Sequence, residues 1–388
     1  MITVKLLFVF AFKKIVSILI NIVPDKRNVG GPSGIIWEVI EFLKSQGHGI
    51  DVYNIPKDNA SFQPQLHIMG LRKYDLRGLD HDPANYDWIL VYPDVLVISL
   101  PKAMLAKSIV LAPDATSMVR IRKCRMYPCN SLKNGIRKLY QYAFYRSFLH
   151  IERKYIRQVH RYLVVGINDR RWLRFHTPKA AWEKVVFLRH PLLSYSMSDL
   201  QAALPASPAK DEKLRFVFAG DLSYSYVGNS VREIAVTLAK KKAVLSILVV
   251  GKRNQWVYDE FLHYGGTSLE IRFIPWVENY QDVCRIGLDI HCMPLISGGG
   301  TKNRTVTAIA NGLEVITTPI GAENIILDGV DHVTICKNMD DFASKMDAVQ
   351  ARGVLSSFEI ADLLDKREKF RQRTTREFQD TLLSAIRG

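Results

Sequence analysis

The first half of the chain alternates short apolar runs with longer amphipathic segments. An amphipathic segment over 35–46 stops at Gly47, the usual position of a glycine that ends a helix. Apolar runs predict buried strands at 15–23, 49–55, 88–91, 95–98 and 109–111. Strand, loop, helix and strand in this order indicate the start of a parallel α/β sheet.

A polar stretch over 205–213 contains two prolines and no large apolar residue, which is the composition of a linker. After it the alternation restarts with greater regularity. Strands are predicted at 214–219, 244–250, 269–274, 289–293, 314–317 and 332–336, with helical patterns in most of the gaps. Six strands with intervening helices are typical of a doubly wound sheet.

These patterns predict an α/β protein of two Rossmann-like domains with doubly wound parallel sheets, which suits a chain of 388 residues. We predict a first domain over 1–204, a second over 205–355, and C-terminal helices over 356–388 that pack across both. Ligands bind at the carboxyl ends of the strands in such sheets, so two domains should share a cleft. This organisation favours an enzyme with two substrates.

The apolar run over 6–23 is not predicted to span a membrane, because Lys13 and Lys14 lie in its middle. It lacks the small-residue cleavage site of a signal peptide. We therefore expect an apolar extension before the first strand, either packed on its own domain or touching a bilayer. Five cysteines without a C-x-x-C pair favour a reducing cytoplasm over a disulfide-rich secreted domain.

A glycine-rich segment over 297–312 carries the clearest chemistry in the sequence. It follows a predicted strand, and Gly299 and Gly300 would let the backbone approach a ligand closely. We expect Thr301 to cap a helix whose free amides attract anions, with Lys302 and Arg304 adding positive charge. The segment predicts a site for a phosphate-bearing ligand, and the alternative is a glycine turn with solvated cations.

This segment resembles the donor-binding stretch of GT-B glycosyltransferases, particularly the family 4 or group 1 type. The resemblance continues through 312–324, and upstream through 216–224 and 249–252. In the first domain it is limited to Gly30, Gly31 and the Gln46-Gly-His48 segment. It implies a GT-B glycosyltransferase, hexosyltransferase-like, retaining and metal-independent, that takes a nucleotide-sugar donor. The acceptor would be a glycan or glycolipid in bacterial polysaccharide or lipopolysaccharide synthesis.

The resemblance also suggests roles for single residues. Glu323 matches the family glutamate near the donor, and Lys252 lies where it can help to bind the diphosphate. The family's two glutamates are replaced by Gly299 and Thr307, so Thr307 is expected to offer only a neutral hydrogen bond to the ribose. Gly30 and Gly31 are expected near a donor or acceptor phosphate. The candidate for a polar group at the reacting centre is Asp114, which could instead be a helix cap.

The net charge of +15 is concentrated in one segment. Residues 118–162 hold twelve lysines and arginines and one acid, Glu152, a net +11, interleaved with aromatic residues. A basic, aromatic and largely helical segment suits an anionic membrane surface or a phosphorylated glycolipid. Nucleic acid is not expected, because no nucleic-acid motif is present, and a plain solvated helix face is the other interpretation.

We therefore expect a cytoplasmic enzyme that is peripheral at the inner face of the cell membrane. No cofactor or metal is expected, because we find no His and carboxylate cluster with the spacing of metal ligands. Two alternatives stay open. One is a nucleotide-sugar epimerase of the same fold, and the other is a glycosyltransferase-like subunit that binds without turnover.

Overall fold

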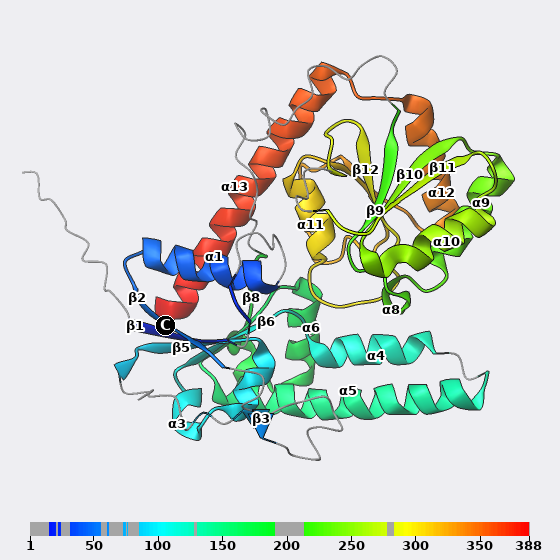
Figure 1. The fold of residues 1–388 in the computed structure, drawn as a ribbon. Coiled ribbons are helices and arrows are strands. Elements are labelled where there is room, and N and C mark those ends of the chain that lie inside the picture. The colour runs from blue at the N-terminus through cyan, green and yellow to red at the C-terminus, as the bar shows by residue number, and fades with distance from the viewer. Residues whose placement is uncertain are drawn as a thin grey trace, which may run out of the picture.

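The computed structural model describes residues 15–20, 22–24, 32–55, 60–61, 73–74, 76, 85–127, 130–190, 213–277 and 283–387. Figure 1 shows two α/β domains and a long C-terminal helix that reaches from one to the other. Gly30, Gly31 and the apolar extension before the first strand lie outside the described residues, as does all of the predicted linker except Lys213.

The first domain is built on a parallel sheet with strand order β2-β1-β5-β6-β7-β8. Its strands are β1 (Ile15–Ile20), β2 (Gly49–Asn54), β5 (Trp88–Tyr92), β6 (Ser108–Ala112), β7 (Arg161–Val164) and β8 (Val185–Phe187). A short antiparallel pair, β3 (Ala60–Ser61) and β4 (Lys73–Tyr74), lies outside this sheet. Four of the apolar runs predicted as strands are confirmed, within a few residues at their ends.

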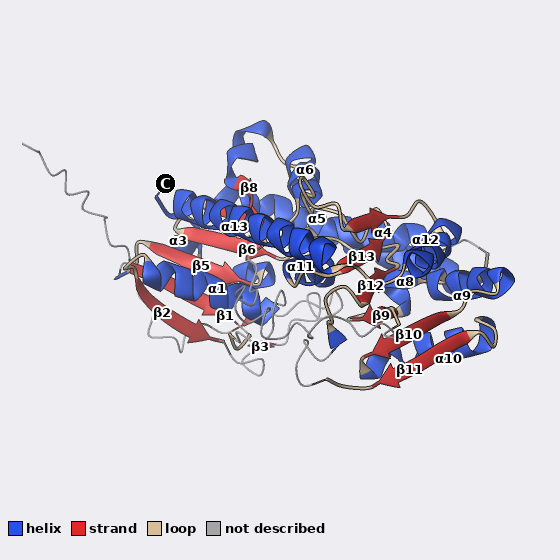
Figure 2. Cartoon of the chain, turned by 90° about the horizontal axis from the view of Figure 1, so that it is seen from above, coloured by secondary structure: helices blue, strands red, loops and turns tan. Residues whose placement is uncertain are grey.

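Helices cover both faces of this sheet (Figure 2). They are α1 (Pro32–Ser45), η3 (Asp94–Ser99), α3 (Lys102–Leu105), α4 (Thr116–Met126), α5 (Leu132–Gln158), α6 (Ile167–His176) and η4 (Lys179–Lys184). The prediction of a strand over 95–98 is wrong, because this run is the 3-10 helix η3. Leu96 and Val97 are buried in that helix, and a short apolar run does not distinguish a buried strand from a buried helical turn.

The second domain has strand order β11-β10-β9-β12-β13-β14, all parallel, which is the order of a doubly wound nucleotide-binding sheet. Its strands are β9 (Arg215–Ala219), β10 (Leu245–Val250), β11 (Leu269–Ile274), β12 (Asp289–Met293), β13 (Glu314–Thr317) and β14 (Val333–Ile335). Its helices are α8 (Tyr224–Val227), α9 (Ser230–Lys241), η5 (Lys252–Asn254), α10 (Gln255–Tyr264), α11 (Asn303–Ala310) and α12 (Met339–Arg352). All six predicted strands are confirmed.

The segment predicted to pack across the domains is one helix, α13 (Ser357–Arg387). Its first half contributes Leu363, Leu364 and Phe370 to the core beside α11 in the second domain. Its second half buries Phe378 and Leu382 against α1 and the sheet of the first domain. The helix therefore crosses both domains, as the two views show (Figures 1 and 2). Within the described residues, no helix is long and apolar enough to cross a membrane.

Candidate functional site

The glycine-rich loop lies between the end of β12 and the start of α11, and it faces the first domain. Gly298 and Gly300 adopt positive φ angles of 135° and 61°, which glycine reaches without strain. Val119 of α4 packs so closely on Gly299 that a Cβ there would overlap its side chain. A Cβ on Gly300 would lie 2.5 Å from the carbonyl oxygen of Pro113. The glycines thus allow a close approach, and in this structure the approaching group is the first domain.

The cations predicted in this loop point in different directions. Lys302 is half-buried and turns back, donating from Nζ to the carbonyl oxygen of Gly299 at 2.6 Å. Burial lowers the pKa of its ammonium group. Arg304 is exposed at the start of α11, with its side chain against Gly220 at the end of β9. The loop, the N-terminus of α11 and these cations therefore meet at the carboxyl edge of the second sheet.

Thr301 does not cap the helix, which corrects the expectation from the sequence. The N-cap residue of α11 is Lys302, and its side chain makes no capping hydrogen bond. The Thr301 hydroxyl donates instead to the backbone carbonyl of Val165 in the first domain. Thr301 is therefore an interdomain contact. At the other end of α11, Gly312 has a φ of 68°, as the predicted stop position requires.

Glu323, the glutamate singled out by the resemblance, binds side chains of the first domain. The Arg122 guanidinium from α4 donates to both carboxylate oxygens at 2.6 Å each. Asn168 Nδ2, at the start of α6, donates to the same carboxylate at 2.8 Å. Burial alone would raise the pKa of Glu323, but these two partners and the charge of Lys302 outweigh it and hold the pKa below its usual value. Glu323 is therefore an ionised carboxylate that binds across the domain boundary.

Asp169 is a fully buried carboxylate that binds the glycine loop directly. Its Oδ1 accepts from the backbone N–H of Ala115 at 2.6 Å and from that of Gly300 at 3.3 Å. Its Oδ2 accepts from Asn324 Nδ2 at 3.3 Å, and the same amide nitrogen donates to the Gly300 carbonyl at 2.6 Å. Burial raises the pKa of Asp169, and the two backbone amides oppose that rise.

Asp114, the predicted polar group near the reacting centre, lies beside this loop. It follows β6, and its Cβ is 3.3 Å from the position that a Cβ on Gly300 would take. Burial and the charge of Asp169 raise its pKa to about 6. A carboxylate with such a pKa is ionised at neutral pH yet basic enough to take a proton, the property a general base requires.

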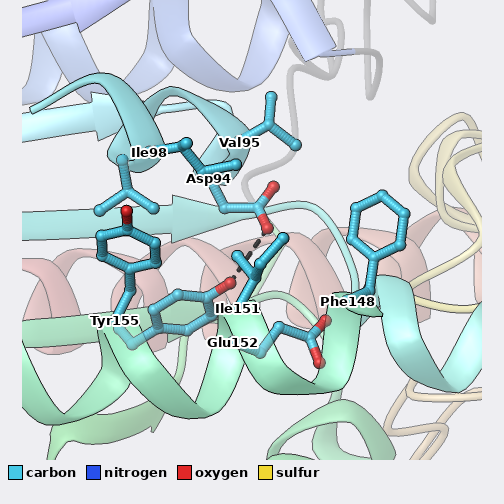
Figure 3. A pocket seen from close by; sticks show the side chains of 9 residues that line it. Asp94, Val95, Ile98, Phe148, Ile151, Glu152 and Tyr155 are labelled. Atoms are coloured by element: carbon cyan, nitrogen blue, oxygen red, sulfur yellow. Dashed lines mark hydrogen bonds between the residues drawn. The ribbon is translucent and has the colours of Figure 1, made fainter. Parts of the chain in front are cut away.

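The first domain buries two further acids, Asp94 and Glu152, which line a small pocket (Figure 3). The Tyr162 hydroxyl donates to Asp94 at 3.0 Å, and the Ser117 N–H donates to Glu152 at 3.0 Å. Burial raises the pKa of Asp94 to about 7 and that of Glu152 to about 8. The remaining Glu152 oxygen has no hydrogen-bond partner. The charge of Asp114 adds to the rise of both pKa values, so Asp94 and Glu152 hold their protons at a higher pH than exposed acids do.

The other predicted residues lie farther from the loop contacts. Thr307 is buried in the middle of α11, with 3% of its surface exposed. Lys252 is exposed in η5 after β10, the strand next to β9. Among the described residues, no group of three or more His, Cys, Asp or Glu is arranged to hold a metal ion.

Sequence reasoning missed Arg122, Asn168, Asp169 and Asn324 as parts of this site. Asn168 and Asp169 follow β7 at the carboxyl edge of the first sheet, and that position was a usable signal. Asn324 directly follows Glu323. Arg122 gave no signal of its own, because it is one of twelve cations in the basic segment.

Comparison with known proteins gives one family and a set of similar folds. The family "Glycosyl transferases group 1" matches residues 199–351, which include every strand of the second sheet. A glycosyltransferase from Rickettsia africae is 16% identical, with a TM-score of 0.57 and 97% of each chain covered. No curated protein sequence matches the chain.

Two further solved structures are similar over nearly the whole chain. HepE from Anabaena, solved in complex with UDP and glucose, is 9% identical, with a TM-score of 0.53, covering 96% of this chain and 97% of its own. WaaG, a glycosyltransferase involved in lipopolysaccharide biosynthesis, is 13% identical, with a TM-score of 0.54, covering 96% of this chain and 98% of its own. At these identities the likeness shows the fold, which is the GT-B arrangement of two facing α/β domains.

Proposed function

We propose that this chain, a GT-B glycosyltransferase whose second domain matches the group 1 family, transfers a sugar from a nucleotide-sugar donor to a glycan or glycolipid acceptor. The observation that carries the proposal is the glycine loop with its cations at the carboxyl edge of a doubly wound sheet. Ligands of such sheets bind at this edge. HepE, which shares the fold, was solved with UDP and glucose, and this supports a nucleotide-sugar donor.

The chemistry follows from the charges near the loop. Transfer requires that a departing nucleoside diphosphate be stabilised while an acceptor hydroxyl attacks the sugar. The N-terminus of α11, Lys302 and Arg304 supply positive potential for that leaving group. Asp114, with its pKa of about 6, is placed to assist proton transfer beside the same loop. The resemblance to the family supports retention of configuration without a metal.

The test is turnover of a panel of sugar nucleotides by a variant in which Lys302 and Arg304 are both changed to alanine. We expect turnover to be abolished in this variant, because two cations that stabilise the leaving group are removed. The matched control changes Lys240 and Lys241, two exposed cations at the end of α9, to alanine. Equal turnover by the two double variants would contradict the proposal.

The acceptor is proposed to be lipid-linked, because the first domain carries a surface suited to an anionic bilayer. Helices α4 and α5 form a hairpin that extends beside the second domain, and the N-terminal end of α5 lies far from the first sheet (Figure 1). One face of that end exposes apolar side chains, the apolar ridge, flanked by exposed Lys133 and Arg137. The ridge consists of Leu132, Ile136, Leu139 and Tyr140, exposed by 83%, 60%, 70% and 51%.

An exposed apolar stripe beside cations is the pattern of an interfacial helix. Cations near an anionic surface contribute about 1 kcal/mol each, and the ridge adds burial in the head-group region. This supports a peripheral protein at the inner face of the cell membrane, as a bacterial enzyme of lipopolysaccharide or polysaccharide synthesis would need. WaaG, another protein of this fold, is described as acting in lipopolysaccharide biosynthesis.

Liposome flotation tests this assignment. Changing Leu132, Ile136 and Leu139 to serine should weaken binding to neutral and anionic vesicles alike. Changing Lys133 and Arg137 to glutamine should weaken binding to anionic vesicles only. The control is Phe358→Ser, which removes an 83% exposed ring from α13. Binding that does not depend on the ridge or on anionic lipid would count against a membrane role.

The epimerase alternative gains one observation, since Asp114, Asp169 and Glu323 bring three carboxylates around the loop. Epimerisation exchanges a carbon-bound proton of the sugar with solvent. Incubating sugar nucleotides in deuterated water without acceptor distinguishes an epimerase from a transferase. An epimerase incorporates deuterium into the recovered sugar, and a transferase leaves it free of deuterium. The third possibility, a binding subunit without turnover, predicts nucleotide or glycan binding and no product from any donor.

A further inference from the structure

Both oxygens of Glu323 are taken by the first domain. Arg122 provides two hydrogen bonds of 2.6 Å and Asn168 one of 2.8 Å, so the carboxylate faces α4 and α6. The proposed function places Glu323 at the donor. These bonds occupy most of the acceptor positions of the carboxylate, so a donor sugar must compete with Arg122 and Asn168 for it.

The same partners hold the glycine loop. Arg122 Nη1 also donates to the Gly298 carbonyl at 2.8 Å. The Asn168 N–H donates to Asn324 Oδ1 at 2.9 Å, and Asn324 in turn binds the Gly300 carbonyl at 2.6 Å. Asn324 has a φ of 69°, in the left-handed region, which lets its side chain reach back to the loop. Gly298 and Gly300 are therefore both buried and hydrogen-bonded to these partners.

An internal carboxylate fills the place of an anionic ligand. The Gly300 N–H donates to Asp169, and Val119 and Pro113 pack against Gly299 and Gly300. A phosphate that used this amide and this space would have to displace Asp169 and the turn after β6. The two domains must separate before that is possible.

We propose that Arg122 and Asn168 form a latch that keeps the domains closed over the glycine loop and excludes the donor until the latch opens. The inference rests on the proposed function, because it is the proposed function that assigns the loop to a donor. The pair is bidentate and charge-assisted, with side chains exposed by 24% for Arg122 and 7% for Glu323. Such a pair is protected from solvent well enough to favour the closed arrangement of the two domains over the open one.

The latch has a measurable consequence for affinity. When only a fraction of the molecules is open, the apparent dissociation constant for a ligand is raised by the inverse of that fraction. Removing one strong charged pair shifts such an equilibrium by about tenfold or more. Arg122→Gln should therefore bind nucleoside diphosphate about tenfold more tightly than the natural chain. If Arg122 were instead a direct donor contact, the same change would weaken binding.

The experiment uses the full chain in solution, without membranes, and the variants Arg122→Gln, Asn168→Ala and Arg125→Gln. Arg125 is exposed at the end of α4, so its variant removes the same charge from the same helix. Hydrogen exchange over 298–301 without nucleotide reports opening, and calorimetry with uridine, guanosine and adenosine diphosphates reports affinity. We expect Arg122→Gln to speed exchange and tighten binding, Asn168→Ala to do both to a smaller extent, and Arg125→Gln to do neither.

The outcomes separate the latch from the proposed function. Unchanged exchange in Arg122→Gln, or weaker nucleotide binding by it, overturns the latch. Faster exchange in a chain that binds none of the three nucleotides supports the latch and removes the assignment of the loop to a nucleotide-sugar donor.

Discussion

Replacing Gly300 with alanine tests how tightly the two domains are closed. A Cβ at this position would lie 2.5 Å from the carbonyl oxygen of Pro113, where ordinary contact begins near 3.4 Å. The opposing atom belongs to the backbone of the first domain, so it cannot swing aside as a flexible side chain would. The two surfaces must therefore separate locally by about 0.9 Å, the difference between these two distances.

A gap of this size is enough to break the contacts around the loop. If the separation extends to Arg122 and Glu323, their 2.6 Å bonds lengthen to about 3.5 Å, beyond the usual range of an N–H···O bond. The variant also incurs a cost of about 1–2 kcal/mol for a non-glycine residue at a φ of 61°. The expected result is a chain that still folds but whose domains are open without a ligand.

Gly329 provides the matched control, because its φ is 72° and a Cβ there would meet no atom within 4 Å. Gly329→Ala has the same backbone cost without the clash. Small-angle scattering and hydrogen exchange over 298–301 should show opening in Gly300→Ala and none in Gly329→Ala. Two variants with the same radius of gyration and the same exchange rates would refute this account of the closed loop.

Two further predictions concern buried charges. Burial raises the pKa of Glu152 to about 8 in the native state, whereas the same carboxyl ionises near pH 4 in the unfolded chain. The free energy of unfolding should therefore fall progressively as pH rises from about 4 to 8. In urea titrations, the stability of Glu152→Gln relative to the natural chain should therefore increase between pH 5 and pH 8.5. A stability difference that stays constant over this pH range would be inconsistent with a raised pKa of Glu152. Asp289→Ala should cost about 3–5 kcal/mol of unfolding free energy in the same assay, because Asp289 is buried and accepts two bonds from Arg215 at 2.6 and 2.8 Å.

The fold was largely predictable because its signal is local and repeated. Most strands of the second sheet are short apolar runs, and β11 alternates apolar and charged residues, so all six could be placed from the hydrophobic pattern. The run over 95–98 was misread, because η3 buries Leu96 and Val97 as a strand would. Hydrophobicity reports burial, and in a run of four residues it does not report backbone conformation.

The site was predictable only on one side of the cleft. Gly299, Gly300, Lys302 and Glu323 lie on contiguous segments of the second domain with recognisable spacing. Their partners Arg122 and Asp169 are more than 100 residues away in sequence, and only the closing of the domains brings them together. The role expected for Thr301 failed for the same reason, since its hydroxyl binds Val165 of the first domain.

The way in which α13 is anchored limits how this molecule can move. Its first half is fixed in the core of the second domain, and its second half is fixed in the core of the first. A continuous helix of 31 residues, roughly 46 Å long, resists stretching and bending along its length. The domains therefore cannot simply slide apart. They must rotate about a hinge that runs along α13, with the widest gap on the side opposite this helix and little displacement beside it.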